Sequence, residues 1–108
     1  LATAPQVLAD AGVETQIIGE VADTDPRQRA MLAWVLRESV TNVVRHSDAT
    51  SVVIELGPHG LTVTDNGRGC GGPEGNGLRG MRERVAAAGG SLSLHDAAPG
   101  CRVQVALP

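Results

Sequence analysis

Two groups of polar residues in this sequence have the types and the spacing to bind a nucleotide. Asp65-Asn66-Gly67-Arg68-Gly69 follows an alternating apolar run, and Glu38 and Asn42 lie four residues apart in a long helical pattern. Residues four apart project from the same face of a helix. A carboxylate at the end of a strand, followed by backbone with few side chains, suits a purine base.

The carboxylate of Asp65 indicates which purine. It can accept a hydrogen bond from the exocyclic amine of adenine, whereas guanine presents a carbonyl oxygen there. An unpaired buried acceptor costs about 1 to 3 kcal/mol, so Asp65 would favour adenine by roughly tenfold to hundredfold. Taken alone, Asp65-Asn66-Gly67 is more typical of a plain turn after a strand than of a binding site.

Five glycines extend this interpretation along the chain. Gly67 and Gly69 permit the backbone to approach a flat base closely. Gly75, Gly77 and Gly80 can leave main-chain N–H groups facing phosphates at the start of a helix. Because glycine loops connect strands and helices in proteins of many functions, this pattern is not decisive by itself.

The long helical pattern supplies different chemistry. The amide oxygen of Asn42 suits Mg²⁺, and the carboxylate of Glu38 can take a proton from an attacking group. One turn further on, Arg45 and His46 are predicted to reach phosphate oxygens. Each of these residues alone is more often a solvated helix residue, but together they predict Mg²⁺ and ATP.

Composition excludes several other functions. The net charge is −3 and all nine basic residues are arginine, so a nucleic-acid-binding face and lysine chemistry are both disfavoured. No apolar run approaches the ~20 residues that cross a bilayer, and direct membrane contact is not expected. The spacing of Cys70 and Cys101 does not fit paired metal ligands, and we expect two unremarkable thiols in a reducing cytoplasm.

Periodicity and turn signals predict one domain over residues 1–108. We expect helices over 3–11, 25–46 and 78–88, and strands over 13–18, 50–56, 61–64, 91–95 and 102–107. Apolar and polar residues alternate over 13–18, which predicts a half-buried strand there. The strands 50–56 and 61–64 are expected to be antiparallel neighbours. The longest helix carries an apolar stripe formed by Leu32, Val35 or Leu36, Ser39 or Val40, and Val43. This order predicts an α/β (α+β) two-layer sandwich, with helices packed on one face of a mixed, mostly antiparallel sheet.

Three motifs resemble those of the GHKL ATPase superfamily. The segment 38–47, ESVTNVVRHS, resembles its N box in the form found in sensor histidine kinases of the nitrate-sensor and lipid-fluidity-sensor type. The segments 65–69 and 75–84 resemble its first and second glycine boxes. The boxes occur in the family's order, and the resemblance covers essentially the whole chain, including the final strand.

The resemblance implies an ATP-binding catalytic domain with the Bergerat fold. By position, Asp65 would bind the adenine amine, Asn42 would hold Mg²⁺, and Glu38 would act as base or orient the water of the metal. The stretch from Gly75 to Leu78 would flank the phosphates. In this subfamily the γ-phosphate passes to a histidine on a dimerisation domain and then to a response regulator. The full-length protein is therefore expected to be a homodimer with this domain in the cytoplasm.

Three departures limit what the resemblance implies. The stretch from Cys70 to Glu74 is a very short lid without an aromatic residue, and Gly100-Cys101 stands where relatives often have Gly-Thr. None of the three histidines has a phosphoacceptor context. The chain is therefore expected to be a catalytic fragment, without its dimerisation, phosphoacceptor and sensor domains, that binds Mg²⁺-ATP but cannot complete phosphotransfer alone.

Two alternatives stay open at this point. Within the superfamily, the chain could be a serine kinase acting on an anti-anti-sigma protein, or an ATPase module related to gyrase, mismatch-repair or chaperone ATPases. Outside enzymes, it could be a nucleotide-binding module that has kept the fold without turnover. The short lid disfavours the first alternative, and the presence of Glu38 and Asn42 disfavours the second.

Overall fold

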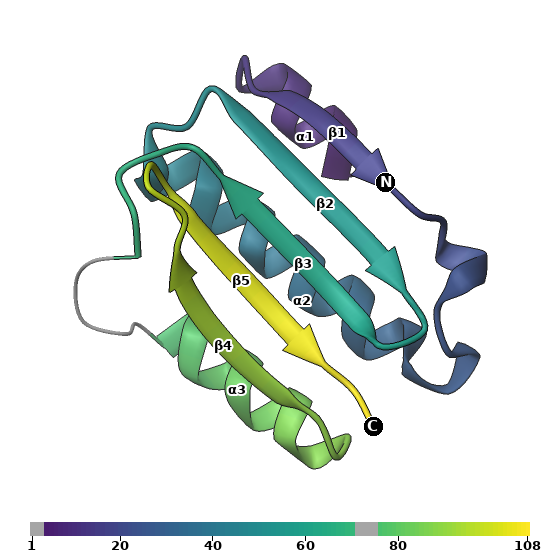
Figure 1. Cartoon of the computed structure of the whole chain (residues 1–108). Helices are drawn as coiled ribbons and strands as arrows, with labels where there is room; N and C mark the ends of the chain where they lie inside the picture. The colour runs from purple at the N-terminus through teal and green to yellow at the C-terminus, as the bar shows by residue number, and fades with distance from the viewer. Residues whose placement is uncertain (1–3, 71–75) are drawn as a thin grey trace.

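The fold is a five-stranded sheet covered on one face by three helices. A computed structural model describes residues 4–70 and 76–108. The elements are α1 (Ala4–Asp10), β1 (Glu14–Ile18), α2 (Arg29–Asn42), β2 (Ser51–Gly57), β3 (Gly60–Asp65), α3 (Asn76–Ala87), β4 (Ser91–Asp96) and β5 (Cys101–Ala106). The strand order is β1-β2-β3-β5-β4, in which β1 and β2 are parallel and all other neighbours are antiparallel (Figure 1). The predicted two-layer class is confirmed.

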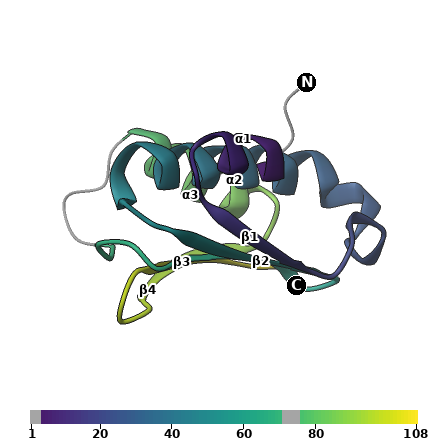
Figure 2. The ribbon, with the colours of Figure 1, turned by 90° about the horizontal axis from the view of Figure 1, so that it is seen from above.

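The helices and the sheet enclose an aliphatic core. All three helices lie on the same side of the sheet, which leaves the opposite face open (Figure 2). The predicted stripe of α2 is confirmed, because it contributes the buried residues Leu32, Val35, Ser39 and Val40, followed by Val43. From the sheet, Val52, Ile54, Leu61, Val63 and Val105 are among the residues that pack in the same core. None of the helices in the described residues is long and apolar enough to cross a membrane.

The long helical run consists of three segments. Asp25 begins it by capping the 3-10 turn η2 (Pro26–Gln28), where its Oδ1 accepts a hydrogen bond from the Arg27 amide at 3.0 Å. The pKa of the Asp25 carboxyl is lowered, mostly by the hydrogen bond from the Arg27 side chain and next by the hydrogen bond from the Arg27 amide. After α2, the chain continues through a π-helical turn, η3 (Val43–Ser47), which ends at Asp48 in the left-handed region with φ 55°.

The first strand is more exposed than its alternating pattern predicts. Ile17 and Ile18 are 47% and 46% exposed, and only Thr15 within β1 is partly covered. The prediction of a half-buried strand is therefore wrong for most of β1. The reason is its position at the sheet edge, where β2 is its only neighbour among the described strands.

The two ends of the sheet are built differently. One end, called here the hairpin end, contains the turn between Gly57 and Gly60. The other end, called the site end, contains Asp65 at the end of β3 and Ser51 at the start of β2. Because Asp65 pairs with Val52, and only residues 48–50 separate η3 from β2, the C-terminal end of α2 lies at the site end.

Candidate nucleotide-binding site

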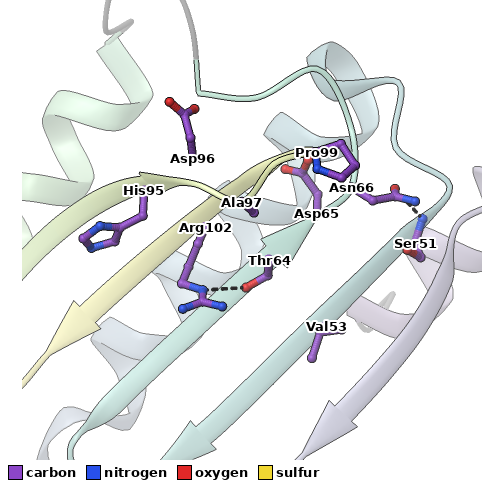
Figure 3. Close-up of a pocket in the computed structure, with 10 residues that line it drawn as sticks. All are labelled: Ser51, Val53, Thr64, Asp65, Asn66, His95, Asp96, Ala97, Pro99 and Arg102. Atoms are coloured by element: carbon purple, nitrogen blue, oxygen red, sulfur yellow. Dashed lines mark hydrogen bonds between the residues drawn. The ribbon is translucent and has the colours of Figure 1, made fainter.

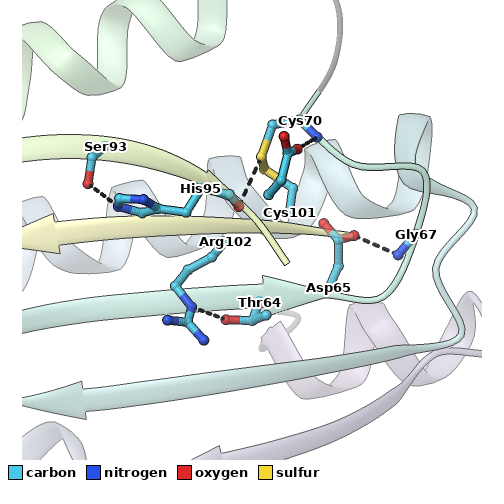
Figure 4. The surroundings of a disulfide bond; sticks show 9 residues. Thr64, Asp65, Gly67, Cys70, Ser93, His95, Cys101 and Arg102 are labelled. Carbon is cyan, nitrogen blue, oxygen red and sulfur yellow. Dashed lines mark hydrogen bonds between the residues drawn. A yellow bond between two sulfur atoms is a disulfide. The ribbon is translucent and has the colours of Figure 1, made fainter. Parts of the chain in front are cut away.

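Asp65 lies at the site end, and one of its carboxylate oxygens already accepts a hydrogen bond within the chain. It is the last residue of β3 and is 8% exposed. Its Oδ1 accepts a hydrogen bond from the Gly67 amide at 2.8 Å, whereas Oδ2 accepts none from the described residues (Figure 4). The turn therefore holds the carboxylate in one orientation and leaves an acceptor for another group.

Asn66 anchors the loop rather than facing a ligand. Its Oδ1 accepts hydrogen bonds from the amides of Thr50 and Ser51 at 2.9 and 3.0 Å, and its Nδ2 donates to Thr50 Oγ1 at 2.9 Å. These bonds tie the loop after β3 to the start of β2. Sequence reasoning missed this role, although an asparagine directly after the strand-end aspartate is a typical turn residue that bonds nearby backbone.

Two further contacts fix the same loop. Arg68 Nε lies 3.1 Å from Asp48 Oδ2, which links the loop to the end of η3 on the exposed surface. Gly100 has a φ of 103°, and the backbone of Asp65 and Asn66 leaves no room for a side chain on it. Position 100 therefore requires glycine, because it lies against the backbone of Asp65 and Asn66. This requirement becomes visible only in the folded structure.

The polar residues of α2 reach the site end to different extents. Glu38 and Asn42 are half-buried, and within the part of the chain that the structure describes neither side chain has a hydrogen-bond or ion-pair partner. Arg45 is exposed on η3. The side chain of His46 lies outside the described residues, so its predicted phosphate contact stays a prediction, as does that of Arg45.

Helix α3 brings the second glycine segment to the same end. It begins at Asn76, so Gly77 and Leu78 lie in its first turn, and Leu78 packs against the core. Gly75 lies outside the described residues. Gly80 faces α2, where an added Cβ would lie 3.6 Å from the Trp34 ring. The structure thus gives Gly80 a helix-packing position, and its predicted nucleotide contact stays a prediction.

Side-chain contacts join α3 to α2. The buried Ser39 hydroxyl donates to the sulfur of Met81 at 3.8 Å, and the Arg84 guanidinium lies 4.0 Å from the centroid of the Trp34 ring. A cation over an aromatic ring at this distance is attractive. The helix that begins with the second glycine segment is therefore held against the helix that carries Glu38 and Asn42.

The pairing of the two cysteines contradicts one prediction from the sequence. Cys70 and Cys101 form a disulfide, with Cα atoms 4.9 Å apart across a sequence separation of 31 residues (Figure 4). The prediction of two unremarkable thiols is wrong in this structure. The spacing of the two cysteines along the chain does not predict this disulfide, because the pairing depends on how the loop after β3 folds back onto the start of β5.

A pocket of about 380 Å³ opens beside the candidate site, largely on the uncovered face of the sheet. Ser51, Val53, Thr64 and Arg102 line it from the strands, and His95 and Pro99 line it from the β4–β5 hairpin (Figure 3). Asp65 also reaches its wall, but the predicted residues of α2 do not. This pocket is therefore distinct from the space between Asp65 and the helices.

Comparisons with known proteins point to one family. The chain is 38% identical over 88 residues to the signal transduction histidine-protein kinase/phosphatase UhpB of Salmonella typhimurium, covering 75% of this chain and 17% of that protein. It is 40% identical over 80 residues to the sensor histidine kinase YxjM of Bacillus subtilis, covering 68% of this chain and 20% of that protein. The chain thus spans about a fifth of the length of these curated relatives. No protein-family profile matches it.

Solved structures agree on the fold. The histidine kinase domain of the blue-light activated kinase EL346 from Erythrobacter litoralis superposes with a TM-score of 0.73 at 20% identity, over 97% of this chain and 57% of that chain. The ATP binding domain of PrrB from Mycobacterium tuberculosis superposes with a TM-score of 0.65 at 19% identity, over 99% of this chain and 94% of that chain. The chain belongs to the sensor histidine kinase family and has the fold of its ATP-binding domain.

Proposed function

We propose that this chain binds Mg²⁺-ATP at the site end and donates the γ-phosphate to a histidine on a separate dimerisation domain of a two-component sensor kinase. One observation carries the proposal. The end of β3 with Asp65, the end of α2 with Asn42 and the first turn of α3 meet at one end of the sheet, although they are distant in sequence. The kinase names of the relatives support it.

The adenine end of the nucleotide would lie against Asp65. The Gly67 amide occupies Oδ1, so Oδ2 is the acceptor that remains for the exocyclic amine. Because Asp65 is 8% exposed, this acceptor lies in a site that is largely shielded from water. A purine that brings a carbonyl oxygen there would leave the carboxylate unpaired and bind more weakly.

The phosphates would lie between α2 and the first turn of α3. The first amides of a helix have no partner within the helix, and they carry the positive end of its dipole. Gly77 in that turn lets phosphate oxygens approach the backbone without meeting a side chain. Gly69, with a φ of 105°, turns the loop that leads away from Asp65.

The residues of α2 fit a metal ion that arrives with the phosphates. Glu38 and Asn42 offer a carboxylate and an amide oxygen that no described residue occupies, and Mg²⁺ prefers such hard oxygen ligands. The described residues hold no group of three or more acidic, histidine or cysteine side chains that could bind a metal unaided. Asn42 would hold the ion, with water and phosphate oxygens as its other ligands, and Glu38 would accept a proton or orient the water of the metal.

The acceptor histidine would come from another domain. Phosphoryl transfer depends on in-line placement of donor and acceptor more than on covalent participation by the protein. We propose that a dimerisation domain of the full-length homodimer provides that placement, and that an aspartate on a response regulator then receives the phosphate. The domain would act in the cytoplasm, without nucleic acid and without touching the membrane itself.

Calorimetric titration with Mg²⁺-ATP tests the binding step. We expect saturable binding to the wild-type chain and a loss of roughly tenfold to hundredfold in affinity for Asp65→Asn, since the acceptor of the adenine amine is weakened. Glu55→Gln is the matched control, because it removes one negative charge from an exposed position of β2. Absent binding in the wild type, or equal losses in both variants, would contradict the proposal.

Transfer to a separately prepared dimerisation domain tests the catalytic step. We expect acid-labile phosphate on that domain, and a Glu38→Gln variant that transfers roughly 10²- to 10⁴-fold more slowly while binding ATP normally. Unchanged transfer in this variant would refute the role of Glu38. ATP hydrolysis without acid-labile phosphate, or phosphate on serine, would favour the ATPase or serine-kinase alternative.

A further inference from the structure

The disulfide joins the two segments that enclose Asp65. Cys70 is the last described residue of the loop that follows β3, and Cys101 is the first residue of β5. In the β3–β5 ladder Thr64 pairs with Arg102, so Cys101 is the next residue along β5 toward Asp65 (Figure 4). The bond therefore lies beside the carboxylate that is proposed to bind adenine.

The far end of this loop has few other contacts that hold it to the sheet. Its beginning is well fixed by the three hydrogen bonds of Asn66 and by the bond from the Gly67 amide to Asp65. At Cys70, by contrast, the only hydrogen bond from the described residues runs from its amide to the exposed Asp96 at 3.3 Å. The sulfur of Cys70 also lies 3.3 Å from the His95 carbonyl oxygen. The disulfide is thus the main link between this end of the loop and the β4–β5 hairpin.

The bond is open to chemical attack. Cys70 and Cys101 are both half-buried rather than enclosed in the core, and we expect a small thiolate to reach their sulfur atoms. Disulfides in reducing compartments are usually transient and either catalytic or redox-sensing. Exchange with a dithiol reductant breaks the Cys70–Cys101 bond and gives two thiols. The reductant supplies two electrons and two protons and closes a disulfide of its own.

We propose that Cys70–Cys101 is a redox modification site, at which a dithiol reductant lowers the affinity of the neighbouring site for nucleotide. This inference rests on the proposed function. In the oxidised chain the loop is already ordered beside Asp65, whereas in the reduced chain nucleotide binding must order it. Ordering one more backbone residue corresponds to about a fivefold to thirtyfold change in an equilibrium constant, and we expect a loss of that size on reduction.

The experiment compares Mg²⁺-ATP affinity by calorimetry before and after treatment with dithiothreitol. The chain contains only two cysteines, so the reductant has a single target. Alkylation and mass spectrometry count the free thiols in each sample. We expect no free thiols and tighter binding before reduction, two free thiols and weaker binding after it, and recovery when the bond is re-formed by air oxidation.

Two variants serve as controls. The double variant Cys70→Ser with Cys101→Ser should bind like the reduced chain and ignore the reductant. The single variant Cys101→Thr should behave in the same way, and it provides a second test if the double variant does not fold. Equal affinity of oxidised and reduced chains, or two free thiols under oxidising conditions, would overturn the inference and leave the proposed function intact. Failure of both forms to bind ATP would overturn the proposed function, and this inference with it.

Discussion

Different kinds of contact hold the chain together at the two ends of the sheet. At the hairpin end, backbone contacts dominate: Gly57 pairs with Gly60, and the Leu107 amide donates to the His59 carbonyl at 2.8 Å. At the site end, side chains hold the loop, through Asn66, through the ion pair of Arg68 and through the disulfide of Cys70. The site end leaves the half-buried side chains of Glu38 and Asn42 without partners among the described residues.

This difference indicates how the fold separates stability from ligand binding. At an end closed by backbone contacts, a substitution whose side chain meets the main chain is poorly tolerated, because that main chain cannot move alone. An end closed by side chains can be loosened contact by contact without disturbing the core. Substitutions at the hairpin end should therefore lower stability and spare nucleotide affinity, whereas those at the site end should lower both stability and nucleotide affinity.

The largest effect is expected for Gly60→Ala at the hairpin end. Gly60 has a φ of 139°, and an added Cβ would overlap the carbonyl oxygen of Val105 on β5. Backbone strain and overpacking together should lower the free energy of unfolding by about 4 kcal/mol, as measured by urea denaturation. Gly57→Ala is the control, because its Cβ would meet nothing within 4 Å. Equal stability of the two variants would contradict this account of the hairpin end.

Loss of the disulfide should have the next largest effect on stability. The bond closes a loop with a sequence separation of 31 residues, so its removal should lower the free energy of unfolding by about 3.5 kcal/mol through the entropy of the unfolded chain. Denaturation of the Cys70→Ser, Cys101→Ser double variant measures this change. The same variant under reducing conditions should show no further loss, and a further loss would mean that the reductant acts elsewhere.

Asn66→Ala should have a smaller effect, confined to the site end. It removes three hydrogen bonds from the start of β2, but water can replace them at this exposed position. We expect a loss of about 1 to 2 kcal/mol in stability, together with weaker binding of ATP. Asn66→Asp keeps the oxygen that accepts from Thr50 and Ser51 and should lose less. If Asn66→Ala left both properties unchanged, the loop would not depend on side-chain anchors.

The smallest effect concerns the cap of η2, which precedes the N-terminal end of α2. The hydrogen bonds from the Arg27 side chain and amide lower the pKa of Asp25 below its ordinary value. A depressed carboxyl pKa stabilises the fold above the unfolded value of about 3.9, and this contribution is lost as the pH falls through the lower folded value. Thermal unfolding of the wild type and Asp25→Ala should therefore differ slightly at pH 6, and the difference should shrink as the pH falls through the folded pKa of Asp25. A difference that does not shrink over this range would have another cause.

Much of the fold could be predicted from the sequence, because local patterns fix it. The apolar stripe of α2, the turn between Gly57 and Gly60, and the glycines after α3 each specify an element or its boundary within a few residues. The exposure of Ile17 could not be predicted, because alternation does not tell an edge strand from a central one. The π-helical turn that follows Asn42 could not be predicted either, because no glycine or proline interrupts the run.

Sequence patterns supply the residue types proposed for the candidate site, whereas the contacts that hold these residues in place depend on the fold. We could propose Asp65, Glu38 and Asn42 from the sequence, because their residue types and spacing suit contacts with adenine and Mg²⁺. The anchoring role of Asn66 and the pairing of Cys70 with Cys101 depend on which strands become neighbours, and that information is not local. The contacts of all the proposed site residues with nucleotide or Mg²⁺ stay predictions, namely those of Glu38, Asn42, Arg45, His46, Asp65, Gly67, Gly69, Gly75, Gly77, Leu78 and Gly80.

The central claim is that Mg²⁺-ATP binds at the site end, between Asp65 and α2. Mapping of amide chemical shifts by NMR during a titration with Mg²⁺-ATP tests it most directly. We expect the largest changes in residues 38–45, 65–70 and 76–80, and little change near Gly57 and Gly60. Changes centred on the hairpin end, or on the open-face pocket around Arg102 and His95, would contradict the assignment.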